Sequence, residues 1–190
     1  VARVSIGVSE WLIENMKSPS VVIGYDCRFG GRLFAETAAK VFATMGIGVK
    51  LSKGFVSTPM VSLGVVNEKA SLGVVITASH NPPMYNGYKL KGDFGGPLLP
   101  KDILDVEKRI PHVNTIQYRS ISIEYLEKRG DIVYVDLESE YCDHAKNNFN
   151  LDIIKNSKMN FAYDAMFGAG MNVIKNLLPD TTLLHCSNNP

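Results

Sequence analysis

The side chains most capable of chemistry are concentrated in one polar stretch, from Thr77 to Leu90. It reads Thr-Ala-Ser-His-Asn-Pro-Pro-Met-Tyr-Asn-Gly-Tyr-Lys-Leu and follows a continuous apolar run over residues 72–76. Open α/β sheets place their ligands at the carboxyl ends of such strands. Asn81-Pro82-Pro83 disfavours helix and holds the backbone in an extended or turned path. Ser79 is therefore expected to be both exposed and rigid, which suits a nucleophile.

The adjacent residues Ser79 and His80 have two other interpretations. Small polar residues after a strand most often form an ordinary turn. A serine hydrolase is the second interpretation, but the chain has no Gly-x-Ser-x-Gly elbow. The adjacency of Ser79 and His80 in sequence also disfavours a direct nucleophile–base pair. Local chemistry alone therefore favours the turn and leaves the hydrolase as a weak hypothesis.

The elements that must position this stretch alternate between helix and strand. Helices are predicted from apolar residues at helical spacing and from Ser57-Thr58-Pro59, a hydroxyl cap with proline in the first turn. In chain order the sequence predicts a helix at 4–12, a strand at 21–23, a helix at 34–45, a strand at 49–52, a helix at 58–68, a strand at 72–76, a return strand at 87–90 and a helix at 101–110. This order favours a layered α/β/α domain with a mixed, mostly parallel sheet.

A second, similar α/β unit is expected to follow. The pattern is mixed over 124–136, and we place a domain boundary there, between residues 133 and 134. Beyond it the sequence predicts a helix from 138, a strand at 159–163, a loop at 167–170, a helix to 178 and a strand at 182–185. The loop lacks the third glycine of GxGxxG and is interpreted as a tight turn. Because the chain starts at Val1 rather than Met and stops soon after an apolar run, we expect both ends to be cut.

The composition argues against several classes of protein. The chain has 190 residues, is 45% hydrophobic and 21% charged, and has a net charge of +1 from 20 basic and 19 acidic residues. This balance argues against nucleic acid or a membrane surface as the main partner. Cys27, Cys142 and Cys186 are far apart and form no CxxC pair, which favours a reducing cytoplasm over a disulfide framework or a zinc site. No apolar run approaches the ~18 residues of a membrane span.

Four segments together resemble the phosphoglucomutase/phosphomannomutase family of phosphohexomutases. The family's active-serine loop reads Thr-x-Ser-His-Asn-Pro, then Asn-Gly and a lysine, and residues 77–89 keep both elements and their spacing. Residues 24–28, Gly-Tyr-Asp-Cys-Arg, are similar to its Gly-Tyr-Asp-x-Arg, and residues 57–59 to its helix start. Residues 164–170, Asp-Ala-Met-Phe-Gly-Ala-Gly, are similar to its Asp-x-Met-x-Gly-x-Gly turn. The resemblance implies that 1–133 is domain I and 134–190 an incomplete domain II.

The resemblance also implies roles for residues of this loop. In the family the serine, here Ser79, is stored as phosphoserine and gives its phosphoryl group to a hexose monophosphate. His80 and Lys89 are the matching positions for proton handling and phosphate contact, and the sequence leaves open which is the base. Substrate or phosphate binding is implied for Arg28, Asn81 and Lys91. Two alternatives stay open, since Arg28 could instead anchor the loop and Lys91 could be a solvated surface residue.

Magnesium is the cofactor that the resemblance implies, with hexose 1,6-bisphosphate as activator. Phosphoryl transfer commonly uses Mg²⁺ held by carboxylates, and in the family the phosphoserine, here at Ser79, is a further ligand. The family's Asp-Gly-Asp-x-Asp-Arg metal loop does not occur in this sequence, and neither does its Thr-Ser-Gly-x-Arg-Gly loop. We therefore expect the 190 residues alone to bind metal weakly and to turn over little substrate.

The leading hypothesis is a cytoplasmic isomerase of carbohydrate metabolism, an intramolecular phosphotransferase acting on hexose 1- and 6-phosphates. Asn81-Pro82-Pro83 and Gly95-Gly96-Pro97 lean towards glucose or mannose rather than glucosamine. The alternative is a non-catalytic sugar-phosphate-binding module with the same fold. Hexose phosphates are the expected partners, and the sequence does not specify an oligomeric state.

Overall fold

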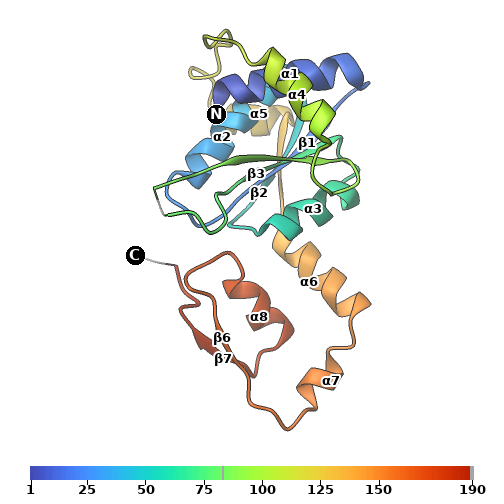
Figure 1. The fold of residues 1–190 in the computed structure, drawn as a ribbon, viewed down its shortest axis with the longest axis vertical. Helices are drawn as coiled ribbons and strands as arrows, with labels where there is room; N and C mark the ends of the chain where they lie inside the picture. The colour runs from blue at the N-terminus through green and yellow to red at the C-terminus, as the bar shows by residue number, and fades with distance from the viewer. Residues whose placement is uncertain (83, 189–190) are drawn as a thin grey trace.

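A computed structural model describes residues 1–82 and 84–188 (Figure 1). Pro83, part of the predicted Asn81-Pro82-Pro83 turn, lies outside the described residues. The elements are, in order, α1 Ala2–Asn15, β1 Ser20–Tyr25, α2 Gly31–Thr44, β2 Gly48–Ser52, α3 Thr58–Asn67, β3 Leu72–Ile76, β4 Tyr88–Gly92, α4 Pro100–Arg109, α5 Ile123–Arg129, β5 Ile132–Val135, α6 Leu137–Asn148, α7 Asp152–Lys155, β6 Ala162–Asp164, α8 Met171–Leu177 and β7 Thr182–Leu184.

The main sheet has five strands in the order β4-β3-β1-β2-β5. β1 pairs in parallel with both β2 and β3, β5 pairs in parallel with β2, and β4 returns antiparallel to β3. From β1 the chain crosses through α2 to one neighbour, and from there through α3 to the other. The connections therefore diverge between β1 and β3, and this switch point is where open α/β sheets bind ligands.

Two apolar layers hold helices on opposite faces of this sheet (Figure 1). Successive strand residues point to opposite faces, so Val21 and Ile23 face one layer while Val22 faces the other. The first layer includes side chains from α1, α2, α4 and α5, and the second includes side chains from α3 and α6. The central strands β1 and β3 are buried on both faces, as their continuous apolar sequences predict, while the edge strands β4 and β5 are partly exposed.

A second unit follows β5 and is much smaller. Its sheet consists of β6 and β7, which pair in parallel over three residues each. The helix α6 contacts α3 of the first unit and α8 of the second. Buried side chains from α6 and α8, Leu137, Cys142 and Val173, belong to the layer beneath the first sheet. The second unit thus rests on the first rather than on a core of its own.

The predicted α/β fold class is confirmed, with differences at several elements. The return strand β4 is longer than the predicted 87–90, and β6 begins three residues after the predicted 159. The sequence does not predict α5, β5 and α7: α5 and α7 are short, and β5, although apolar, lies in the stretch 124–136 where the pattern is mixed. The boundary between 133 and 134 stays a prediction, and β5 crosses it while pairing with the first sheet.

No helix within residues 1–82 and 84–188 combines the length and the apolar character needed to cross a membrane.

Candidate active site

The loops that leave the carboxyl ends of β1, β2 and β3 surround a cleft of about 980 Å³. The turn between β6 and α8 forms its opposite wall. Its lining consists of Asp26, Cys27, Arg28, Phe29, Phe55, Val56, Ser57, Thr58, Thr77, Ser79, His80, Met166, Phe167, Gly168, Ala169, Met171 and Asn188. The loop between β3 and β4, residues 77–82 and 84–87 (the serine loop), therefore lies at the switch point of the sheet and opens onto the largest cavity described.

Ser79 is exposed to this cleft and has an unusual backbone conformation. Its φ is +54°, in the left-handed region that non-glycine residues rarely adopt. Its amide donates to Thr77 Oγ1 at 3.1 Å, while its Oγ makes no hydrogen bond with the described residues. Residues kept in such conformations cost about 1–3 kcal/mol and persist only when their surroundings hold them. The side chain of Ser79 is thus presented to the cleft by a loop that other groups must hold.

Asp26 and Thr77 connect the end of β1 to the end of β3. The hydroxyl of Thr77 donates to Asp26 Oδ2 at 2.5 Å, and the Asp26 amide donates to the carbonyl of Ile76 at 3.2 Å. The other carboxylate oxygen, Oδ1, accepts the amide of Arg28 at 3.1 Å. The carboxylate therefore bridges the two loops that meet at the switch point.

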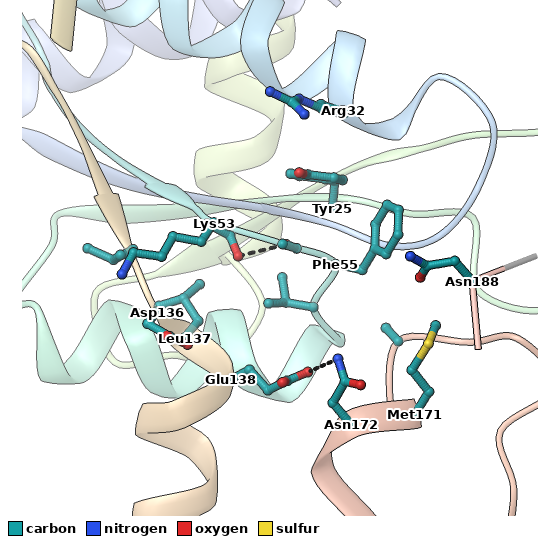
Figure 2. Close-up of a pocket in the computed structure, with 15 residues that line it drawn as sticks. Tyr25, Arg32, Lys53, Phe55, Asp136, Leu137, Glu138, Met171, Asn172 and Asn188 are labelled. Atoms are coloured by element: carbon teal, nitrogen blue, oxygen red, sulfur yellow. Dashed lines mark hydrogen bonds between the residues drawn. The ribbon is translucent and has the colours of Figure 1, made fainter. Parts of the chain in front are cut away.

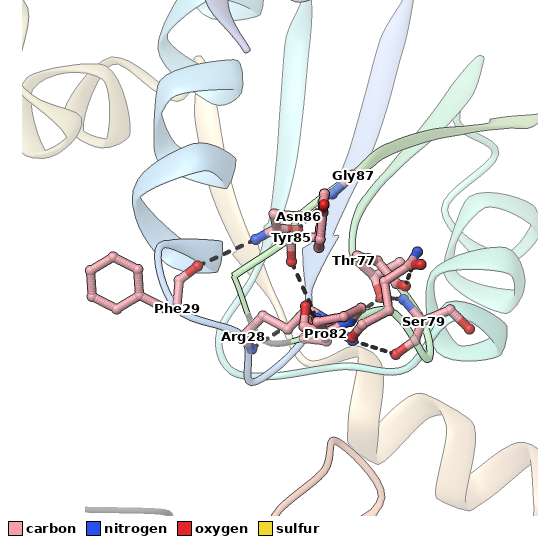
Figure 3. Close-up of polar contacts among 11 residues, drawn as sticks. Arg28, Phe29, Thr77, Ser79, Pro82, Tyr85, Asn86 and Gly87 are labelled. Carbon is pink, nitrogen blue, oxygen red and sulfur yellow. Dashed lines mark hydrogen bonds and ion pairs between the residues drawn. The ribbon is translucent and has the colours of Figure 1, made fainter.

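Arg28 is the residue with the most contacts to the serine loop (Figure 3). Its Nη1 donates to the carbonyls of Pro82 at 2.9 Å and Tyr85 at 3.2 Å. Its Nη2 donates to the carbonyls of Ser79 and Asn81, both at 2.6 Å. Its Nε lies 3.5 Å from Asp26 Oδ2, and only 15% of the side chain is exposed. The sequence left two interpretations of Arg28 open, a phosphate-binding residue and an anchor of the serine loop. These contacts favour the anchor.

The other predicted site residues lie at different distances from the cleft. His80 is exposed and lines it beside Ser79. Asn81 is exposed on the same loop, where its Nδ2 donates to the carbonyl of Ala78 at 2.9 Å. Lys89 and Lys91 lie on β4, opposite Val75 and Gly73 respectively, and are not among the residues that line the cleft. The structure thus brings His80 to Ser79 and leaves the two lysines on the neighbouring strand.

The turn that faces Ser79 across the cleft is also held in a left-handed conformation. Met166 and Phe167 have φ values of +48° and +58°. Asp164 Oδ1 accepts the Met166 amide at 2.8 Å, and both its oxygens lie 2.9 Å from His185 Nδ1. The rings of Phe167 and His185 lie 4.9 Å apart, tilted by 52°. The hydrogen bond from the Met166 amide, followed by that with His185, lowers the pKa of the Asp164 carboxyl.

A second cavity of about 480 Å³ adjoins the first and shares Phe55, Val56, Ala169, Met171 and Asn188 with it (Figure 2). Its other wall carries Glu138, whose carboxylate accepts from Asn172 Nδ2 at 3.5 Å (Figure 2). Burial raises the pKa of Glu138, although the Asn172 bond opposes the shift. The two cavities together form one trough between the units.

The thiol of Cys27 lies in the wall of the same cleft, but it is only weakly reactive. Burial, with a smaller contribution from the charge of Asp26, raises the pKa of this thiol from 9.0 to about 11. The thiolate is the nucleophilic form of cysteine. At neutral pH Cys27 is therefore a thiol rather than the nucleophilic thiolate.

The described residues do not make a magnesium site on their own. Within 1–82 and 84–188, no three His, Cys, Asp or Glu side chains are grouped so that they could hold a metal ion. Magnesium takes oxygen ligands in near-octahedral geometry, usually with carboxylates among them.

Two features of the site were not predicted from the sequence. The bridge between Asp26 and Thr77 depends on loops 51 residues apart, although both residues belong to recognised motifs. The wall formed by Met166 and Phe167 depends on how the second unit sits against the first. Neither arrangement leaves a local pattern in the sequence.

Comparisons with known proteins agree with this geometry. A family model described as "Phosphoglucomutase/phosphomannomutase, alpha/beta/alpha domain I" matches residues 1–117. The chain is 30% identical over 182 residues to "Phosphoglucomutase" of Staphylococcus haemolyticus, covering 94% of this chain and 32% of that protein. It is 31% identical over 182 residues to "Probable phosphomannomutase" of Haemophilus influenzae, covering 94% of this chain and 36% of that protein. The chain thus spans about a third of the length of these relatives.

Solved structures extend the comparison to the second unit. The crystal structure of a "putative phosphomannomutase" from Thermus thermophilus superposes with a TM-score of 0.80 at 29% identity. The match covers 96% of this chain and 40% of that chain. The shared fold therefore includes the small second sheet as well as the five-stranded one.

Proposed function

Because the chain belongs to the phosphoglucomutase/phosphomannomutase family, we propose that it carries the phosphoryl-transfer serine of a hexose-phosphate mutase. The protein would interconvert hexose 1-phosphate and hexose 6-phosphate through a phosphoserine at Ser79 and a hexose 1,6-bisphosphate intermediate. One observation carries the proposal. Ser79 is exposed in a left-handed conformation at the switch point of the sheet, within the family's motif and at the wall of the largest cleft described.

The proposed reaction is a pair of phosphoryl transfers. In the first, a hydroxyl oxygen of the hexose monophosphate forms a bond to the phosphorus, the bond from phosphorus to Ser79 Oγ breaks, and the hydroxyl proton passes to a base. Ser79 Oγ leaves as an alkoxide and takes up a proton, which gives the hydroxyl that starts the second transfer. In the second, Ser79 Oγ forms a bond to the phosphorus of the other phosphate, the bond from that phosphorus to the sugar oxygen breaks, the serine proton passes to a base and the sugar oxygen takes up a proton. A serine hydroxyl needs such a base to become a competent nucleophile.

His80 and Lys89 are the proposed proton-handling groups. His80 shares the cleft with Ser79, and imidazole is the side chain that most readily exchanges protons near neutral pH. Lys89 is exposed on β4, and its amine makes no hydrogen bond or ion pair with the described residues. A phosphoserine carries about −1.5 to −2 charges at neutral pH. We propose that Lys89, Lys91 and Asn81 contribute to binding the phosphate groups.

Magnesium is the proposed cofactor, with hexose 1,6-bisphosphate as activator. When bound, the ion would neutralise charge on the transferred phosphoryl group. The contribution proposed for this chain is a phosphate oxygen on Ser79, since the described residues provide no carboxylate cluster. Glucose and mannose phosphates are the proposed substrates, in the cytoplasm, without nucleic acid or membrane as partner.

A coupled mutase assay on the full-length protein tests this proposal. Wild type, Ser79→Ala and a control, Ser120→Ala, would be compared with glucose 1-phosphate and mannose 1-phosphate in turn, with Mg²⁺ and a trace of bisphosphate. Ser120 is exposed and does not line the cleft. We expect turnover by wild type and by the control, and none by Ser79→Ala. Equal turnover by Ser79→Ala would refute the role of Ser79, and a folded wild type inactive on all hexose phosphates would favour the binding module.

A further inference from the structure

We propose that Arg28 is a positioning residue that clamps the serine loop in its strained conformation, rather than a ligand of the transferred phosphate. The effect of the clamp on turnover rests on the proposed function. The clamp itself rests on the contacts of Arg28 with residues 79–85 and can be tested without turnover.

The donors of the Arg28 guanidinium are all directed at groups of the protein. A guanidinium has five N–H groups and accepts no hydrogen bond. Here both Nη atoms donate to two carbonyls each, those of Pro82, Tyr85, Ser79 and Asn81. The remaining N–H, on Nε, is on the side of Asp26, 3.5 Å away. In this arrangement both terminal nitrogens of the guanidinium are occupied by carbonyls, and Nε faces a carboxylate, so the cation is directed at the protein rather than at a phosphate oxygen.

The serine loop depends on this cation for its conformation. Four carbonyl oxygens of one loop point at the same guanidinium, although their partial negative charges repel one another. A hydrogen bond to a charged group contributes about 1.5–3 kcal/mol, comparable to the roughly 1–3 kcal/mol that the left-handed φ of Ser79 costs. The cation therefore stabilises the conformation that exposes the Ser79 side chain.

Arg28 is itself held in place by Asp26. Asp26 Oδ1 accepts the Arg28 amide and Oδ2 faces its Nε. The same carboxylate accepts the hydroxyl of Thr77, which in turn accepts the amide of Ser79. Asp26 thus orients Arg28 from one side and the serine loop from the other. The side chains of Arg28 and Asp26 are largely buried, at 15% and 18% exposure.

Lysine cannot replace arginine in this role. Its ammonium carries three donors on a flexible stem, without the planar fork that reaches two pairs of carbonyls at once. Arg28→Lys keeps the positive charge, so if Arg28 only attracted phosphate, the variant would retain part of its function. If Arg28 holds the serine loop, the variant would lose the hydrogen bonds to the four carbonyls. A displacement of about 1 Å at a reacting group can cost about a hundredfold in rate.

The test compares Arg28→Lys and Asp26→Asn with Arg129→Lys in the full-length protein. Arg129, at the end of α5, is exposed, pairs with Asp131 and lines neither cavity, so it makes the matched control. Amide hydrogen exchange is followed in the serine loop, with α2 as the internal reference for global stability. Steady-state kinetics are measured on the same samples with hexose 1-phosphate.

For both clamp variants we expect exchange in residues 77–87 to accelerate about tenfold or more, with α2 and the control unchanged. The value of kcat should fall about a hundredfold while KM stays within about threefold, because the lost contacts position the reacting serine. Unchanged loop exchange in Arg28→Lys, with KM raised about tenfold or more, would overturn the clamp and identify a phosphate ligand.

A measurement on the wild type covers the case in which the variants fail to fold. In ¹⁵N-arginine-labelled protein, a guanidinium bonded on both Nη atoms should show separate, slowly exchanging Hη signals for Arg28. One averaged, rapidly exchanging signal would overturn the clamp. If wild type has no mutase activity, the proposed function fails, while the exchange and NMR results still decide the clamp.

Discussion

The two units differ in how much apolar core each one has. In the first, the central strands β1 and β3 are buried along nearly their whole length, between two layers of apolar side chains. In the second, β6 and β7 each alternate between exposed and half-buried residues. Three buried side chains of the second unit, Leu137, Cys142 and Val173, belong to a layer of the first.

This difference in burial corresponds to a difference in what each unit contributes to the cleft. The first unit supplies a rigid frame, from which Asp26 and Arg28 hold the serine loop. The second contributes a turn, Met166–Phe167, that closes the cleft from the other side and depends on local contacts with Asp164 and His185. Mutations should therefore have large effects on the frame and small, local effects on the turn.

The largest effect is expected at the joint between the units. Leu137 is 1% exposed, and its side chain occupies the space where a Cβ on Gly64 would stand. Leu137→Ala should lower the free energy of unfolding by about 2–5 kcal/mol, because it leaves a cavity in a shared core. Leu184→Ala, at 47% exposure in β7, is the matched control and should change little. Chemical denaturation would check both, and similar losses would contradict the comparison.

A smaller loss is expected from overpacking the frame beside the cleft. A Cβ at Gly24 would lie 2.4 Å from Val61 Cγ2 and 2.5 Å from Val56 Cγ2. Gly24→Ala should therefore cost about 1–3 kcal/mol, measured by thermal unfolding. Nothing lies within 4 Å of a Cβ at Gly54, so Gly54→Ala serves as the control. A Gly24→Ala protein as stable as wild type would show that β1 and α3 are not tightly packed there.

Thiol reactivity probes the frame at the mouth of the cleft. Since the pKa of Cys27 is raised from 9.0 to about 11, its alkylation by iodoacetamide at pH 8 should be about a hundredfold slower than that of glutathione. The rate should rise with pH through about 11, and the stability that the protonated thiol contributes should be lost over the same range from about 9.0. Peptide mass spectrometry would assign the site. Cys27 reacting as fast as glutathione would mean that the loop opens to solvent.

The smallest effect is expected in the turn of the second unit. The pKa of Asp164 is lowered from 3.8 by the Met166 amide and by His185. Its contribution is therefore present above pH 3.8 and lost as the pH falls through the lowered value. Exchange of the Met166 amide, corrected for its intrinsic pH dependence, should accelerate over that range while amides of β1 stay protected. Asp164→Asn should remove this pH dependence, and its persistence in the variant would assign it to another group.

Sequence predicted the frame better than the turn for a physical reason. Strands such as 72–76 are continuous apolar runs, and helices such as α3 begin at a hydroxyl residue followed by proline, so local chemistry specifies them. The strand predicted at 159–163 is displaced because Met159 and Phe161 are apolar yet exposed. In a unit with so little core, apolar character does not report burial.

Within the candidate site, too, some features can be predicted from the sequence and others cannot. Ser79 and His80 could be placed at the cleft because a motif and a preceding strand fix them in sequence. The contacts of Arg28 with four carbonyls could not be predicted, since they join segments more than 50 residues apart. Sequence left Arg28 between two roles, and its contacts with four carbonyls favour the anchor of the loop.

Phosphopeptide mass spectrometry on the full-length protein is the most direct test of whether Ser79 carries the transferred phosphoryl group. The protein would be incubated with glucose 1,6-bisphosphate, digested, and compared with the same sample chased with unlabelled glucose 6-phosphate. We predict one phosphate on the peptide that contains Ser79, lost during the chase and absent from Ser79→Ala. A protein that turns over substrate while Ser79 stays unmodified throughout would contradict the proposed role of this serine.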